Sequence, residues 1–413
     1  MDKTIDLRGI SGTFRAPPSK SAAHRLLILA ALCGSPVFVR LSPVCGDVEA
    51  TVRCLNSLGA DIRRTGEGYF VEPIRSVPDG KVTLDCGESG STLRFLIPVA
   101  AALGADAVFT GTGRLPERPL APILTALREH GVTDSSDGRL PSEIHGRPEA
   151  GEYRVPGNIS SQFATGLLLA LPLLPGSSIR ITPPVESARY LDITIDALSK
   201  FGYSVRKEAG ADGSVLFTPE NGSRLISPGE ITVEGDWSGG AFFICLGALS
   251  AKGITVTGLD MNSPQGDRAI IDIVRKTGAD VTINGDTVTT RKNRLNPVSI
   301  DVRDIPDLAP CLAALMAFCG EVSGITNAGR LRLKESDRIS TTAALLKAAG
   351  ITVTEKPDGL TITGGKNNPE FTVSSFGDHR ICMAAAVLAS DAKVTVTQAE
   401  AVKKSWPGFF DLF

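Results

Sequence analysis

One motif recurs along this chain: a helix-like segment ending in glycine is followed by two β-rich segments joined by a short turn. Copies lie about seventy residues apart, and their helix-like segments end at Gly59, Gly131, Gly202, Gly278 and Gly350. Glycine suits the left-handed conformation that ends a helix. Alternating segments joined by turns such as Asn284-Gly285 are typical of β-hairpins. Each copy therefore predicts a helix followed by a β-hairpin.

A second helix-like segment, rich in Ala and Leu, precedes most copies of the motif. The clearest examples are SAAHRLLILAALC, STLRFLIPVAAALG, SGGAFFICLGALSA, LAPCLAALMAFCG and DHRICMAAAVLAS. A helix that is apolar on nearly all sides must be buried. We therefore expect these helices at the centres of domains.

The 413 residues are too many for one undivided core. A solenoid is the alternative for any repeat, but solenoid units are shorter, about 20 to 50 residues. We predict an α/β (α+β) protein with two similar domains of three repeat units each, the sixth unit being divided between the chain ends. The predicted domains are residues 14–229, and residues 1–13 together with 230–413.

Two extended segments rich in Gly, Pro and Ser, GTFRAPPSKS and SPGEITVEGDWSGGAF, are expected to cross between the domains. They predict a double hinge near residues 12–18 and 228–236. Such a hinge suits a cleft that closes around a small molecule.

The charges nearly balance, with 43 Lys and Arg against 45 Asp and Glu and a formal net charge of -2. This balance gives no general attraction to nucleic acid or to a membrane surface. We expect neither as a partner, and any anion-binding surface must be built from particular Lys and Arg side chains.

The cysteines show neither C-x-x-C pairs nor the short Cys/His spacing of a zinc site, so we expect free buried thiols and no metal. The first residues, MDKTIDLRGISGTF, alternate like a strand and lack the features of a secretion signal. The apolar run at 167–175 is too short to cross a bilayer and predicts a buried helix end. We therefore expect a cytoplasmic protein.

Two segments of the first half could bind an anion through backbone amides and side chains at a helix start. PPSKSAAHR puts Lys20 and Ser21 at the start of an apolar helix, with Arg25 about one turn later. CGESGSTLRF is a Gly/Ser loop that leads into a helix and contains Gly90 and Arg94. For PPSKSAAHR the alternative is that Ser21 simply caps the helix and that the basic side chains are solvated. For CGESGSTLRF the alternative is a plain Gly-rich turn.

Three further segments of the first half offer polar side chains. These are Arg118 in GRLPERPL, Ser160, Ser161 and Gln162 in GNISSQFATG, and Ser187 and Tyr190 in VESARYLD. The arginine suits bidentate binding of a phosphate or carboxylate, or a surface salt bridge. The serine run suits a phosphate or an N-cap, and the tyrosine suits a polar ligand or amphipathic packing.

The second half supplies the acid-base candidates. They are Asp307 in RDIPDLAP, Lys334, Glu335 and Arg338 in RLKESDR, Asp378, His379 and Arg380 in GDHR, and Lys404 near the end. KESDR could also be a solvated helix start with local ion pairs. GDHR precedes a very apolar helix that should be buried, so its charged start needs a partner.

Taken together, these segments resemble the 5-enolpyruvylshikimate-3-phosphate synthase family. The matching motifs cover essentially the full chain in order: PPSKSAAHR, GSTLRF, ERP, ISSQF, VEGDWS, IPDLAP, LKESDR, GDHR and KKSWPGFF. The resemblance implies the enolpyruvyl transferase fold, an inside-out barrel of two domains with three βαβαββ-type units each. It also implies transfer of the enolpyruvyl group of phosphoenolpyruvate to the 5-hydroxyl of shikimate 3-phosphate, in chorismate biosynthesis.

The resemblance assigns residues to each substrate. Shikimate 3-phosphate would be bound by Lys20, Ser21, Arg25, Ser160, Ser161, Gln162, Ser187, Tyr190, Asp307 and Lys334. Phosphoenolpyruvate would be bound by Lys20, Gly90, Arg118, Gln162, Arg338, Arg380 and Lys404, with Asp378 and His379 in support.

The chemistry needs fixed cations for a carboxylate and a phosphate, and groups that move protons. Glu335 is the candidate general acid toward the methylene carbon, and Asp307 the candidate for orienting and deprotonating the hydroxyl. Lys20 would stabilise charge on the departing phosphate. No metal or organic cofactor is expected, the small-molecule substrates are the only expected partners, and we expect a monomer.

Three positions depart from the family pattern. Glu88 and Ser89 stand where many members have Asn and Ala, and Arg330 stands where many have an Asn that contacts substrate. Gly90 occupies the position at which bulkier residues accompany glyphosate resistance, so the resemblance predicts sensitivity to that inhibitor.

Two rival families are alternatives: one shares the architecture, and the other uses related repeat units. UDP-N-acetylglucosamine enolpyruvyl transferases typically have Asn after the first lysine and a reactive Cys before the ERP-like region, whereas this chain has Ser21 and no cysteine across GTGRLPERPL. RNA-end-processing relatives should show a broad basic surface and a nucleotide-handling histidine near the C-terminus. A non-catalytic ligand-binding relative is the third alternative.

Overall fold

The computed structural model describes residues 1–365 and 368–413. These residues form two compact units. The continuous unit is Lys20–Val233, and the discontinuous unit is Met1–Ser19 together with Glu234–Phe413.

The described residues of the continuous unit contain three four-stranded sheets with the same strand order. The sheets are β14(Glu230–Thr232)-β3(Val37–Arg40)-β5(Gly68–Glu72)-β4(Asp61–Arg64), β6(Val82–Asp85)-β7(Ala107–Thr110)-β9(Ser142–His145)-β8(Thr133–Asp134), and β10(Glu152–Pro156)-β11(Ser178–Thr182)-β13(Val215–Pro219)-β12(Val205–Ala209). In each sheet the first two strands are parallel and the last two form an antiparallel hairpin. The repeat seen in the sequence is therefore one sheet with its helices.

The discontinuous unit repeats this pattern in its described residues, with strands supplied by the N-terminus. Its sheets are β16(Asp280–Asn284)-β17(Thr287–Arg291)-β15(Ile254–Thr257)-β2(Gly12–Arg15), β18(Ser299–Asp301)-β19(Val322–Thr326)-β21(Gly359–Thr363)-β20(Thr352–Lys356), and β1(Lys3–Asp6)-β23(Lys393–Thr397)-β22(Glu370–Ser374). In the last sheet β1 pairs antiparallel with β23 and takes the place of a hairpin.

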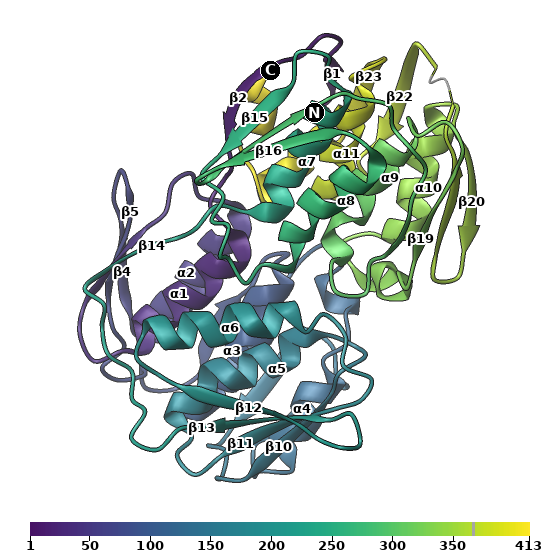
Figure 1. Ribbon diagram of the computed structural model, residues 1–413. Helices are drawn as coiled ribbons and strands as arrows, with labels where there is room; N and C mark the ends of the chain where they lie inside the picture. The colour runs from purple at the N-terminus through teal and green to yellow at the C-terminus, as the bar shows by residue number, and fades with distance from the viewer. Residues whose placement is uncertain (366–367) are drawn as a thin grey trace. The chain divides into compact units, whose positions relative to one another are not determined.

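In each repeat a helix precedes one of the two parallel strands, namely β3, β7, β11, β15, β19 or β23. In the sheets without β14 or β2, this helix is the crossover connection that parallel neighbours need. These inner helices are α1(Lys20–Leu32), α3(Gly90–Leu103) and α5(Ser161–Ala170) in the continuous unit, and α7(Trp237–Leu249), α9(Ala309–Met316) and α11(His379–Leu388) in the discontinuous unit. Each is buried along nearly its whole length, and within each unit the three pack against one another (Figure 1). The expectation of buried central helices is confirmed.

A second set of helices leads into the hairpins and is buried on one face. It comprises α2(Gly46–Ser57), α4(Ala121–Arg128), α6(Arg189–Lys200), α8(Ile270–Thr277) and α10(Arg338–Ala348). Short 3-10 helices complete the connections: η1(Leu115–Glu117), η2(Leu171–Leu173), η3(Gly266–Ala269), η4(Pro306–Leu308), η5(Gly329–Leu333), η6(Ala399–Lys404) and η7(Phe409–Leu412).

The glycines that ended the predicted helices adopt left-handed backbone angles, with φ between 73° and 101° at Gly59, Gly131, Gly202, Gly278 and Gly350. At Gly59 an added Cβ would lie 2.3 Å from the carbonyl oxygen of Ser76. Both this close contact and the left-handed backbone angle exclude a side chain at the position. The expected helix ends are confirmed.

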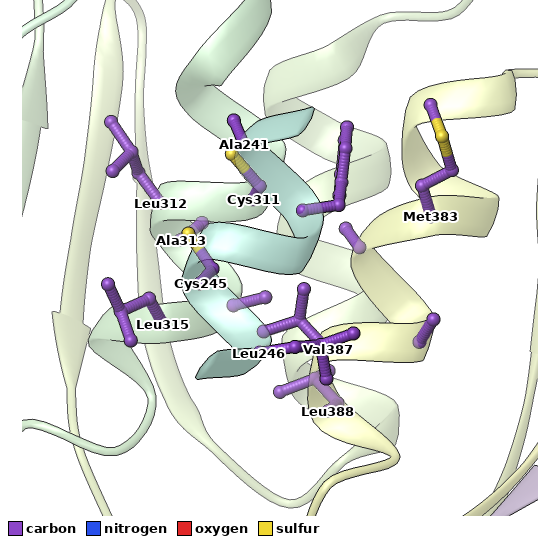
Figure 2. Packing of buried hydrophobic residues seen from close by; sticks show 14 of the residues in the cluster. Ala241, Cys245, Leu246, Cys311, Leu312, Ala313, Leu315, Met383, Val387 and Leu388 are labelled. Atoms are coloured by element: carbon purple, nitrogen blue, oxygen red, sulfur yellow. The ribbon is translucent and has the colours of Figure 1, made fainter. Parts of the chain in front are cut away.

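The core of the discontinuous unit shows how the inner helices fill the space between sheets. Figure 2 shows Cys245 and Leu246 of α7, Ala313 of α9, and Val387 and Leu388 of α11 in one cluster. Small residues on α9 and α11 let the helix backbones approach closely. This packing fixes the N-terminal ends of α9 and α11, where the candidate residues Asp307, His379 and Arg380 lie.

The expectations for the cysteines and for the apolar run are confirmed. All the cysteines are buried and none forms a disulfide. The apolar run at 167–175 is the end of α5 followed by η2. Among the described residues, no helix is both long and apolar enough to cross a membrane.

Candidate active site

In the continuous unit, candidate residues gather at the N-terminal ends of α3 and α5. The side-chain oxygens of Ser89 and Ser160 cap these two helices. Gln162 joins them, because its Nε2 donates to Oγ of Ser91 at 3.0 Å and its Oε1 accepts from Arg94 at 2.7 Å. The two helix ends therefore lie side by side, and their backbone amides and dipoles favour an anion.

Arg118 lies against the first residue of α3. A Cβ added to Gly90 would be 2.4 Å from Nη1 and 2.9 Å from Cζ of Arg118. Glycine at this position leaves room for the guanidinium, which can hold a carboxylate or phosphate beside the helix end.

Lys20, the first residue of α1, forms a salt bridge with Asp47 in the first turn of α2, with 2.8 Å between Nζ and Oδ2. Both side chains are mostly buried. The backbone carbonyl of Asp47 accepts from Thr92 of α3 at 3.3 Å, so the beginnings of three helices are linked. Asp47 was missed in the sequence because GDVE looks like the ordinary acidic first turn of a helix.

Arg25 is buried and bonded to protein groups. Its guanidinium donates to the carbonyls of Ser21 at 2.6 Å and Tyr190 at 3.0 Å, and to the hydroxyls of Thr194 at 2.8 Å and Thr165 at 3.3 Å. Burial lowers the pKa of Arg25 to about 9, which still leaves it charged at neutral pH. It therefore ties α1 to α5 and α6 and positions the neighbouring Ser21 and Tyr190.

In the discontinuous unit, Arg338 at the start of α10 binds three carboxylates. It contacts Asp378 at 2.8 Å, Asp307 at 2.8 Å and Glu335 at 2.6 Å. Its side chain is 1% exposed and that of Asp378 is 0% exposed. Asp378 also caps α11, so the charged start of that apolar helix has the partner that its burial requires.

Asp307, in η4 before α9, lies among cations. Arg380 contacts it at 2.9 Å and Lys334 at 3.7 Å. Burial alone would raise the pKa of Asp307, but the charges of its neighbouring cations, Arg338 included, hold this pKa well below its ordinary value. Asp307 is therefore ionised across the whole physiological range.

The other charged groups of this cluster respond to the same surroundings. Burial lowers the pKa of Lys334 to about 8, against the opposing effect of Asp307. Burial would lower the pKa of Arg338 as well, but its three carboxylate partners raise it above the ordinary value. Arg338 is thus a permanent cation, whereas Lys334 can titrate in mildly alkaline solution.

Lys404 and His379 complete the set in this unit. Nζ of Lys404 donates to the carbonyl of Gly377 at 2.8 Å, immediately before the cap of α11. His379 follows that cap and is buried. Lys334, Glu335 and Lys404 are partly exposed, so a ligand can reach them.

The structure thus brings the predicted residues into two sets, one in each unit. Sequence reasoning left Arg94 and Asp47 out of its site, although each pairs directly with a predicted residue. Arg94 could have been found from its place on the first turns of the Gly/Ser-loop helix. Across residues 1–365 and 368–413, no group of His, Cys, Asp and Glu side chains is arranged to hold a metal ion.

Comparison with solved structures identifies the class of fold. An EPSP synthase from Acinetobacter baumannii superposes with a TM-score of 0.80 at 26% identity, covering 100% of this chain and 97% of that one. The enolpyruvyl transferase NikO from Streptomyces tendae superposes with a TM-score of 0.77 at 17% identity, covering 99% and 95%. The chain has the enolpyruvyl transferase fold, as the sequence predicted.

Comparison with sequences identifies the family. The profile described as EPSP synthase (3-phosphoshikimate 1-carboxyvinyltransferase) matches residues 7–413. Proteins named 3-phosphoshikimate 1-carboxyvinyltransferase from Clostridium kluyveri and Methanocorpusculum labreanum are 40% and 39% identical, covering 99% and 97% of this chain and 96% and 94% of theirs. The chain belongs to the EPSP synthase family and is an enzyme of the transferase class.

Proposed function

We propose that this enzyme transfers the enolpyruvyl group of phosphoenolpyruvate to the 5-hydroxyl of shikimate 3-phosphate, releasing phosphate. The observation that carries the proposal is that one buried cation, Arg338, binds Asp307, Glu335 and Asp378. This arrangement holds two proton-transfer candidates beside a cation suited to an anionic substrate.

Phosphoenolpyruvate brings a carboxylate and a phosphate, and this proposal assigns them to Arg118, Arg338, Arg380 and Lys404, with Gly90 and Gln162 beside them. The arginines supply bidentate hydrogen bonds. Shikimate 3-phosphate is assigned to Ser21, Arg25, Ser160, Ser161, Gln162, Ser187, Tyr190 and Lys334, and Lys20 serves both substrates. The capped end of α5 supports this assignment because a phosphate is favoured there.

In the addition step, the acceptor hydroxyl oxygen bonds to C2 of phosphoenolpyruvate and its proton passes to Asp307. Glu335 delivers a proton to the methylene carbon, which becomes a methyl group. In the elimination step the bond from C2 to the phosphate oxygen breaks, and the methyl group returns one proton to Glu335. The departing phosphate takes up the proton held by Asp307. Lys20 and the arginines stabilise the charge on the departing phosphate.

The low pKa of Asp307 in the free enzyme makes it a weak base, but the cations that lower this pKa are also proposed ligands of the substrate. A bound carboxylate or phosphate would share Arg338 and Arg380, so their effect on Asp307 would weaken. Its pKa would then rise toward the range of a useful general base. Substrate binding and base activation are coupled in this proposal.

Several broader properties belong to the same proposal. The enzyme acts on these small molecules as a cytoplasmic monomer and does not bind nucleic acid. It needs no metal or organic cofactor, because its lysines and arginines supply the required positive charge. The substrate assignments of this proposal draw on residues of each unit. Closure of a double hinge on substrate binding would sequester the reaction from water.

Phosphate release from phosphoenolpyruvate tests the proposal directly. Purified protein without added metal is incubated in parallel with shikimate 3-phosphate and with UDP-N-acetylglucosamine. Release with shikimate 3-phosphate alone is the expected result. Release only with the nucleotide sugar would transfer the chain to the rival activity, and no release with either would overturn a catalytic role.

A further inference from the structure

The repeats of the fold place a candidate residue in one recurrent position, the segment between the second parallel strand and the hairpin. In the order of the chain, this segment carries Asp47, Arg118, Ser187 with Tyr190, Lys334 with Glu335, and Lys404. The segment that follows β15 occupies the same place in its repeat, and no role has been assigned to it. It contains η3, and η3 contains Asp267.

Asp267 is buried, with 4% of its surface exposed. Oγ of Ser238, in the first turn of α7, donates a hydrogen bond to its Oδ2. The segment around it is fixed by Gln265, which accepts from the amide of Trp237 at 3.0 Å and donates to the carbonyl of Gly235 at 2.9 Å. Asp267 is therefore held in a defined place at the start of an inner helix.

The charged groups around Asp267 come from several elements. Asp236, the cap of α7, and Asp307 of η4 repel its negative charge, and Arg380 of α11 attracts it. The nearest charged residue of α8 in sequence, Asp272, has an 84% exposed side chain and is well screened. Asp267 thus shares the electrostatic surroundings of Asp307 and Arg380.

Asp267 is protonated more readily than an ordinary aspartate. Burial raises its pKa to about 7, the repulsion by Asp307 adds to this effect, and Arg380 and Ser238 oppose it. Asp307, by contrast, stays ionised because several cations contact it. One cluster therefore contains a permanently charged carboxylate and a second whose charge changes near neutral pH.

We propose that Asp267 is a positioning residue that regulates how Arg380 is shared between Asp307 and the anionic donor substrate. This inference rests on the proposed function. While Asp267 is neutral, Asp307 and the substrate are the anions that compete for Arg380. Once Asp267 ionises, its added negative charge attracts Arg380 and repels the substrate, so the substrate binds more weakly.

The test is the KM for phosphoenolpyruvate measured between about pH 6 and pH 9 at saturating shikimate 3-phosphate. In the unmodified enzyme KM should rise by about three- to tenfold as pH passes through neutrality, since a coupling of about one pKa unit corresponds to a tenfold change in affinity. In Asp267→Asn this rise should be lost. Ionisation of the substrate phosphate is common to all variants and cancels when their KM values are compared as ratios.

Asp272→Asn is the matched control, because it removes an exposed carboxylate five residues away and should leave the pH profile unchanged. Ser238→Ala is a second variant, which keeps the test valid if Asp267→Asn does not fold. It removes a hydrogen bond that lowers the pKa of Asp267, so the midpoint of the KM profile should move to higher pH.

The outcomes separate the two proposals. An active unmodified enzyme whose KM profile is the same in Asp267→Asn, or has the same midpoint in Ser238→Ala, would overturn the role of Asp267. An unmodified enzyme that releases no phosphate would instead overturn the proposed function. A purely structural role would change stability or kcat without moving the midpoint, and that result also contradicts the inference.

Discussion

Nε of Arg338 donates to Oδ2 of Asp378 at 2.8 Å, and the two side chains are 1% and 0% exposed. A buried ion pair of this kind contributes modestly when complete, but removal of one partner leaves an unpaired charge in the protein interior. Because Arg338 also binds Asp307 and Glu335, three carboxylates depend on it.

Arg338→Met should therefore lower the free energy of unfolding by roughly 3–5 kcal/mol at neutral pH. The loss should be smaller at about pH 5, because the stranded carboxylates then have raised pKa values and are neutralised by protonation. Urea denaturation at the two pH values measures both effects. The control, Arg275→Met, changes an exposed arginine and should cost no more than about 0.5 kcal/mol.

Gly90→Ala should raise the KM for phosphoenolpyruvate while leaving the KM for shikimate 3-phosphate nearly unchanged. The added Cβ would lie 2.4 Å from Arg118, and the guanidinium at the end of that flexible side chain would have to move from the helix end. We expect at least a tenfold increase in KM, since about 1.4 kcal/mol of lost binding energy is sufficient for that change.

Glyphosate, predicted to inhibit the unmodified enzyme, should inhibit Gly90→Ala less. Gly66→Ala is the matched control, because its Cβ would meet no atom within 4 Å. Equal glyphosate inhibition of Gly90→Ala and the unmodified enzyme would remove Arg118 and Gly90 from the shared binding site of the two anions.

The repeat architecture was predictable because its signals are local. The left-handed glycines, the hairpin turns and the apolar helices are each specified by a few neighbouring residues, as the positive φ angles at Gly59 and Gly278 show. The strand order follows from the same repetition, since a helix between parallel strands and a hairpin after them allow few arrangements.

The pairing of site residues was not predictable in the same way, because it joins segments far apart in the sequence. Arg25 was assigned to a substrate from a motif, and the structure shows it bonded to Tyr190 across 165 residues. Asp47 and Asp267 lie in segments that resemble ordinary polar helix starts and turns. Only the packing of α1 against α2, and of η3 against α7, gives these carboxylates their neighbours.

Glu335→Gln should reduce turnover by at least about a hundredfold and leave the affinity for shikimate 3-phosphate within about twofold, because proton transfer contributes on the order of 10²–10⁴ in rate. The amide keeps the size of the side chain and can still accept a hydrogen bond from Arg338. Single-turnover kinetics, with substrate affinity measured separately by calorimetry, distinguishes the two effects.

Glu321→Gln, an exposed position in the same unit, serves as the control. A variant with unchanged turnover would remove Glu335 from the mechanism.

Lys334 should make the binding of shikimate 3-phosphate weaken above about pH 8. Burial lowers its pKa to about 8, so the side chain carries its charge below that pH and loses it above. An arginine at this position should stay charged over more of this range, because its ordinary pKa lies at least about two units above that of lysine. Lys334→Arg should therefore keep its affinity nearly constant from about pH 7 to pH 9.5, whereas the affinity of the unmodified enzyme for shikimate 3-phosphate should fall several-fold.

Calorimetric titration across this range provides the measurement, and Lys347→Arg on α10 is the control for the substitution itself. If the unmodified enzyme and Lys334→Arg show the same dependence on pH, then Lys334 does not contribute its charge to the bound phosphate.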